Sequence, residues 1–282
     1  MTYVEFADRY EQKRVLRKNP KGGTVYLALD VCLGKLVSIE VMDQHTSPEK
    51  FEQFQAEAIL WAKLWHPHIL PLFDVGQTSL GQVFIVSMYI DEITLREKVA
   101  QEKLSYDVSA NMLATMAQTV DFIHQHGMLH LNLNLDSILF DNRNQVVYLT
   151  DFLRLDRLEK DEEGLFFGNI RYTAPEQDQG ELHTLDRRSD IFSLGVIFYE
   201  MLTGKQPFED NAVDLLNNIF PDNPDSPRSL KADIPIKLER ICLKTLSKRP
   251  GDRYSTAAEL ANALLNWQTP SKSWWTKFRD WQ

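Results

Sequence analysis

The chain has 282 residues, of which 43% are hydrophobic and 25% are charged, as is ordinary for a globular protein that can bury a sizeable core. Its formal net charge of −9 argues against a nucleic-acid-binding surface, because phosphate binding requires a basic patch. Cys32 and Cys242 lie far apart in the sequence, which argues against structural zinc and fits a reducing compartment. With neither a signal-peptide pattern nor an apolar run of membrane-spanning length, we expect a soluble, cytoplasmic protein.

The first third of the sequence has the apolar–polar alternation typical of β-strands, and the remainder has helical spacing. The predicted strands cover residues 14–16, 24–29, 35–42, 70–75 and 83–89, and the predicted helices cover 48–65, 95–101, 108–125, 188–202, 235–246 and 255–267. Strands first and helices afterwards indicate an α+β chain with segregated parts and a boundary near residue 90.

Several short motifs carry most of the chemical information. One stretch reads His130-Leu131-Asn132-Leu133-Asn134-Leu135-Asp136-Ser137, and Thr150-Asp151-Phe152-Leu153 and Ala174-Pro175-Glu176 follow it. This is the spacing of the catalytic loop, the magnesium segment and the end of the activation segment in protein kinases. The other motif residues retained at matching positions are Glu57, Asp190 and Arg253. From about residue 10 to 265, the chain resembles a protein kinase, and more narrowly a bacterial Ser/Thr kinase domain.

The resemblance implies a bilobal α+β fold. Residues 1–90 would form a small β-rich lobe with one helix, residues 91–268 a larger helical lobe, and residues 269–282 an aromatic and basic tail. It also implies an ion pair between Glu176 and Arg253. A hydrophobic column anchored by Asp190 would join the lobes through Leu72, Trp61, Phe152 and His130.

Most residues that carry out the chemistry in kinases are replaced. Asn132 occupies the position of the catalytic base, and an amide cannot accept a proton near neutral pH. Glu40 replaces the lysine of the V-A-I-K strand, and at about 4 Å and a dielectric near 20 it would repel a phosphate charge by about 4 kcal/mol. Glu40 would also face Glu57, so either the helix swings outward or the two carboxylates share a proton or a cation. The replaced positions are Glu40, Leu131, Asn132, Asn134, Ser137, Leu153 and Asn169.

The phosphate loop and the metal site are reduced as well. Only Gly23 remains of the kinase glycine-rich pattern over residues 18–25, and Pro20 removes a backbone donor. Asp151 could bind Mg²⁺ only loosely, because magnesium normally also uses substrate phosphates. A structural role for Asp151 as a capping carboxylate is an equal alternative, and we expect no bound metal.

The resemblance implies that part of the kinase nucleotide pocket is retained. Its residues would be Val25, Ser38, Ser87, Met88, Ile90 and Leu139. Apolar residues at these positions also fit a plain interlobe core. We therefore expect no tightly bound cofactor, and leave open weak ATP binding without magnesium.

These features predict a pseudokinase rather than an enzyme, acting as a signalling scaffold or allosteric regulator. Its partner would be an active kinase, a phosphatase or another signalling protein, and not a nucleic acid. The alternatives are an ATP-binding switch without turnover, or an atypical Ser/Thr kinase or nucleotidyl transferase. In the last two, Lys18 or Lys21 would replace the strand lysine, as in with-no-lysine kinases. Segment 272–282 could dock a partner or an anionic membrane surface, with packing on its own domain as the default.

Overall fold

The computed structural model describes residues 9–18, 23–152, 170–178, 186–208 and 224–268. It is an α+β chain with two compact units. The first unit comprises Met1–Thr94 and Ser137–Phe167, and the second comprises Leu95–Asp136 and Gly168–Gln282. The units therefore interleave along the chain, and the lobe boundaries at residues 90 and 268 stay a prediction. Lys21, Leu153, Asn169 and tail 269–282 lie outside the described residues.

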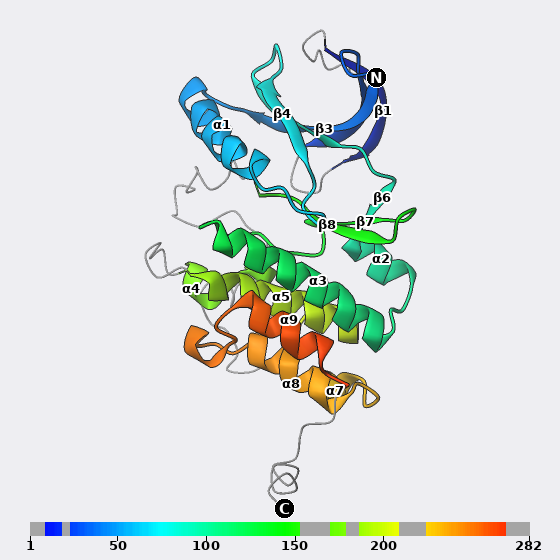
Figure 1. Cartoon of the computed structure of the whole chain (residues 1–282), viewed down its shortest axis with the longest axis vertical. Coiled ribbons are helices and arrows are strands. Elements are labelled where there is room, and N and C mark those ends of the chain that lie inside the picture. Colours follow the sequence, from blue (N-terminus) through cyan, green and yellow to red (C-terminus); the bar gives the residue numbers. More distant parts are fainter. Residues whose placement is uncertain (1–8, 19–22, 153–169, 179–185, 209–223, 269–282) are drawn as a thin grey trace, which may run out of the picture. The chain divides into compact units, whose positions relative to one another are not determined.

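The first unit is built on a five-stranded antiparallel sheet (Figure 1). Its strands, in spatial order, are β1 (Tyr10–Lys18), β2 (Thr24–Asp30), β3 (Lys35–His45), β5 (Gln82–Met88) and β4 (Leu72–Gln77). Alternate residues of the central strands form one hydrophobic core, because successive strand side chains point to opposite faces. This core comprises Tyr10, Tyr26, Ala28, Val37, Ile39, Val41, Phe84 and Val86.

Helix α1 (Pro48–Ala62) packs against β4. It begins after Ser47, whose hydroxyl accepts a hydrogen bond from the backbone N–H of Lys50, and Pro48 occupies the first helical turn. Its apolar stripe buries Phe54, Ala58 and Trp61. The helix ends three residues before the predicted end at residue 65.

A second, three-stranded sheet also belongs to the first unit. It consists of β6 (Glu92–Thr94), β7 (Ile138–Asp141) and β8 (Val146–Leu149). Backbone hydrogen bonds join Leu149 to both His68 and Leu70, so this sheet is tied to the segment after α1. These strands were not predicted, because three or four residues are too few for an alternation signal.

The second unit is helical and is organised around α5 (Arg187–Thr203), which is buried from Ser189 to Thr203. The other α-helices among the described residues are α2 (Leu95–Gln101), α3 (Tyr106–Gln125), α4 (Pro175–Asp178), α7 (Pro227–Leu230), α8 (Ile236–Thr245) and α9 (Ala257–Leu265). Helices α3, α8 and α9 pack against α5 (Figure 1). No helix among the described residues is long and apolar enough to cross a membrane.

Candidate functional site

A buried carboxylate holds the loop that contains Asn132. Asp190, at the start of α5, is fully buried and accepts hydrogen bonds from the backbone N–H groups of His130, at 2.9 Å, and Leu131, at 2.6 Å. The Nε2 atom of His124 lies 2.8 Å from the same carboxylate. Burial opposes ionisation of Asp190, but these hydrogen bonds and the neighbouring histidines outweigh it and lower the pKa of the carboxyl group. The loop is therefore anchored by a charge.

The backbone of this loop is also strained. Leu131 has a φ of +54°, an unfavourable value for a bulky side chain. The N–H of Leu131 donates to Asp190, and its carbonyl accepts a hydrogen bond of 3.5 Å from the side-chain amide of Gln177. The Asn134 side chain donates to the Asn132 carbonyl at 2.7 Å and accepts from the Asp136 N–H at 2.9 Å. Asn134 thus braces the turn in which the Asn132 amide sits.

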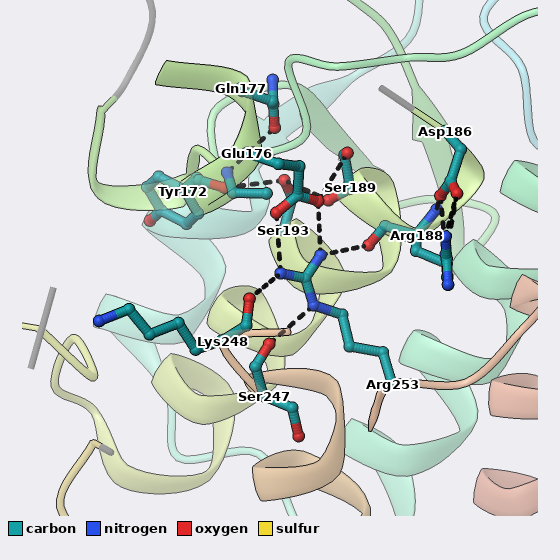
Figure 2. A network of polar contacts seen from close by, with 11 residues as sticks. Tyr172, Glu176, Gln177, Asp186, Arg188, Ser189, Ser193, Ser247, Lys248 and Arg253 are labelled. Carbon is teal, nitrogen blue, oxygen red and sulfur yellow. Dashed lines mark hydrogen bonds and ion pairs between the residues drawn. The ribbon is translucent and has the colours of Figure 1, made fainter. Parts of the chain in front are cut away.

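The predicted pair of Glu176 and Arg253 is present, and Figure 2 shows its network. Two guanidinium nitrogens of Arg253 donate to the two carboxylate oxygens of Glu176, at 2.7 and 2.9 Å. The remaining donors reach the carbonyls of Arg188, Ser247 and Lys248. All five guanidinium N–H groups are therefore used, which fixes the segment after residue 170 to α5 and to the chain before α9.

A cluster of polar side chains around Arg96 was not predicted from the sequence. Arg96 donates to both oxygens of Asp136, at 2.8 and 2.9 Å, and to the Tyr172 hydroxyl at 3.0 Å. Its guanidinium also lies 3.8 Å from Glu200, whose pKa is raised by burial. No local motif signals this cluster, because its members come from four segments of the second unit. Through the bonds from Arg96 to Asp136, the cluster fixes the end of the loop that contains Asn132.

In the first unit, Asp151 and Phe152 follow β8. Asp151 has a φ of +63°, which Asp tolerates better than most residues, and its side chain is partly buried. The backbone N–H of Thr150 donates to the Ser137 carbonyl at 3.0 Å. The rings of Phe152 and Trp61 lie 5.1 Å apart. Part of the predicted hydrophobic column is thus seen within this unit.

The strand register groups the substituted lysine position with half of the predicted nucleotide pocket. Ser38 pairs with Leu27 and Ser87, and Glu40 pairs with Val25 and Ile85. These residues alternate with those of the hydrophobic core, so they line the other face of the sheet. Glu40, on β3, and Glu57, on α1, are both partly exposed. The other half of the pocket, Met88, Ile90 and Leu139, packs with Leu70 and Tyr148 in a separate cluster.

The retained glycine of the phosphate loop has a structural task. Gly23 has a φ of +130°, and a Cβ atom there would lie 2.8 Å from the Val41 carbonyl oxygen. Its N–H donates to Asp43 at 2.8 Å.

Among the described residues no group of three or more His, Cys, Asp or Glu side chains could hold a metal. Asp151 fits magnesium only as one ligand beside substrate phosphates.

Comparison with known proteins identifies the family. Residues 20–266 match the family model described as protein kinase domain. The chain is 34% identical over 279 residues to Serine/threonine-protein kinase PknB of Mycolicibacterium smegmatis, covering 94% of this chain and 44% of that protein. It is 31% identical over 265 residues to Probable serine/threonine-protein kinase PknB of Lactococcus lactis, covering 90% and 41%. The chain therefore spans less than half the length of these relatives.

A solved structure has the same fold. Rad53 residues 1–466, in complex with AMP-PNP, superposes with a TM-score of 0.74 at 24% identity, covering 92% of this chain and 65% of that one. The predicted α+β bilobal kinase fold and the resemblance to bacterial Ser/Thr kinases are confirmed.

The prediction of a pseudokinase that is not an enzyme is wrong by these comparisons, because the relatives are named serine/threonine-protein kinases. Its physical error was to treat each substituted residue as indispensable. Phosphoryl transfer requires positioning and charge neutralisation more than covalent chemistry, so loss of the base reduces the rate without removing the other contributions. The roles of the substituted and retained residues stay predictions.

Proposed function

Because the chain belongs to the protein kinase family, we propose that it transfers phosphate from ATP to serine or threonine hydroxyl groups of a protein partner, at a low rate. The observation that carries this proposal is the match over residues 20–266, together with relatives named for this activity. The fixed loop at Asp190 and the bidentate Glu176–Arg253 pair support it, because they hold segments that the resemblance assigns to catalysis.

Asn132 would act by orientation rather than by proton transfer. Its amide can hydrogen-bond the attacking hydroxyl, whose proton leaves with the transferred phosphate or to water. A general base contributes about 10²–10⁴ in rate, so its absence predicts slow turnover. Asp151 would hold magnesium, which supplies charge neutralisation at the ATP phosphates. The predicted pocket residues Val25, Ser38, Ser87, Met88, Ile90 and Leu139 would contain the purine.

The cation at the phosphates would come from Lys18 or Lys21. Lys18 is exposed at the end of β1, pairs with Thr24 and so lies beside the phosphate loop. Lys18→Ala should weaken ATP binding about tenfold, through loss of one charge-assisted contact. Lys13→Ala is the matched control, because Lys13 lies on the same strand and already pairs with Glu11 at 2.7 Å. Equal effects in the two variants, measured by calorimetric titration, would exclude Lys18 and leave Lys21.

The test of the proposed function uses ATP labelled at either its γ or its α phosphate. Transfer of the γ label to serine or threonine, abolished in Asp151→Asn, supports a kinase. Transfer of the α label instead would indicate a nucleotidyl transferase. The absence of any transfer to a mixture of cellular proteins would overturn the proposal.

A further inference from the structure

The hydroxyl group of Ser38 is buried without a hydrogen-bond partner. Ser38 is 5% exposed, and its Oγ atom has no partner among the described residues. Folded proteins satisfy nearly all buried polar side-chain atoms, so each exception requires an explanation. The backbone of Ser38 is in the regular ladder of β3, so the strand itself does not require a hydroxyl at this position.

The surroundings of Ser38 point to a ligand. The register places Ser38 between Leu27 on one side and Ser87 on the other, on the face of the sheet opposite the hydrophobic core. Ser87 is also small and buried, at 9% exposure. Two small side chains, neither as bulky as a leucine or methionine, therefore lie next to each other on this face.

The same face carries Val25, Ser38 and Ser87 of the predicted purine pocket. Ser87 directly precedes Met88 and lies three residues before Ile90, and the backbone groups of these two residues would pair with the edge of a base. A substituent next to that edge therefore falls beside Ser87 and its strand partner Ser38. The kinase V-A-I-K pattern has alanine at this position, so the hydroxyl is a feature of this chain.

We propose that Ser38 is a specificity-determining residue, whose Oγ accepts a hydrogen bond from the exocyclic amino group of adenine when ATP binds. This inference rests on the proposed function, and adds how the base is recognised. A site built to hydrogen-bond a ligand group discriminates against an analogue that lacks it, because the buried protein group is then left unpaired.

Replacement of Ser38 by alanine separates binding from stability. Ser38→Ala should bind ATP about tenfold more weakly by calorimetric titration, the value of one hydrogen bond inside a protein. The thermal midpoint of the free variant should be unchanged or higher, because the substitution removes an orphaned polar group. A matched control exists in Ser109 of α3, whose buried hydroxyl also lacks a partner among the described residues. Ser109→Ala should have the same effect on the midpoint and none on ATP affinity.

The ligand can be altered at the same atom. Purine riboside triphosphate, which is ATP without the 6-amino group, should bind the wild type about as weakly as ATP binds Ser38→Ala. The wild type and Ser38→Ala should bind this analogue with equal affinity, because the hydrogen bond is already absent. Equal ATP affinity of wild type and Ser38→Ala, or a lowered midpoint in the free variant, would overturn this inference and leave the proposed function standing. Failure of the wild type to bind ATP would overturn both.

Discussion

Two carboxylates, one fully buried and one largely buried, determine how two motif segments of the second unit are held. Glu176 receives a bidentate arginine, and Asp190 receives two backbone N–H groups and a histidine. In both cases the protein surrounds a charge with enough donors to offset the loss of hydration. Removal of one partner from such an arrangement is expensive, because the other stays buried and unpaired.

Arg253→Met should therefore destabilise the fold by about 3–5 kcal/mol, since it removes the two guanidinium donors to Glu176 and three donors to carbonyls, and leaves Glu176 with the Ser189 hydroxyl as a donor. Denaturant titration measures the change. Arg143→Met is the control, because Arg143 is 77% exposed and its pair with Asp91 should contribute less than about 1 kcal/mol. Similar losses in the two variants would contradict this account of the network.

Asp190 gives a prediction for the pH dependence of stability. Because its pKa is lowered in the folded state, its contribution is present above the unfolded pKa of about 3.9 and is lost as the pH falls through the folded value. Asp190→Asn should cost about 3 kcal/mol at pH 7 and should flatten the decline of stability below pH 4. Denaturation midpoints between pH 3 and 7 test this. A variant whose profile runs parallel to that of the wild type would show that Asp190 does not carry the charge.

At the scale of elements, the position of α5 depends on one glycine. A Cβ atom on Gly195 would lie 2.2 Å from the Thr245 hydroxyl and 2.8 Å from its Cβ atom. The two helices α5 and α8 can therefore approach this closely only when residue 195 has no side chain. Alanine is the better helix former, so propensity and packing oppose each other at this position.

Gly195→Ala should destabilise the protein by about 1–3 kcal/mol, because overpacking outweighs the gain in propensity. Gly251→Ala, where nothing lies within 4 Å of the added atom, should be close to neutral. Adding Thr245→Ala to Gly195→Ala should cost less than the sum of the single changes. Additive changes would show that the contact between α5 and α8 does not limit residue 195.

The longer elements were predictable, and the reasons some features were missed are local. Periodicity located α3, α5 and strands β2 to β5 within a few residues, because each has enough turns or alternations to give a signal, but it found only residues 14–16 of β1. Strands β6 to β8 are too short for one. The Arg96 cluster brings together residues from distant segments, and the burial of the Ser38 hydroxyl depends on which strands lie beside β3. No local sequence pattern contains either of these features.

At the scale of the whole molecule, the chain keeps the kinase fold although several of its motif positions carry altered charges. The sequence motifs were sufficient to identify the family, but they did not give the consequence of their substitutions. Asn132, Glu40 and Ser137 were interpreted as loss of function. Catalysis by positioning tolerates a missing base at a cost in rate, and the relatives indicate an enzyme.

The most direct test measures the rate of phosphate transfer from ATP to serine or threonine in three proteins: the wild type, Asp151→Asn and Asn132→Asp. Positioning without a base predicts slow transfer by the wild type, none by Asp151→Asn, and a rate about 10²–10⁴ higher in Asn132→Asp, where a carboxylate can accept the hydroxyl proton. Transfer that is unchanged in Asp151→Asn, or absent from both the wild type and Asn132→Asp, would contradict it.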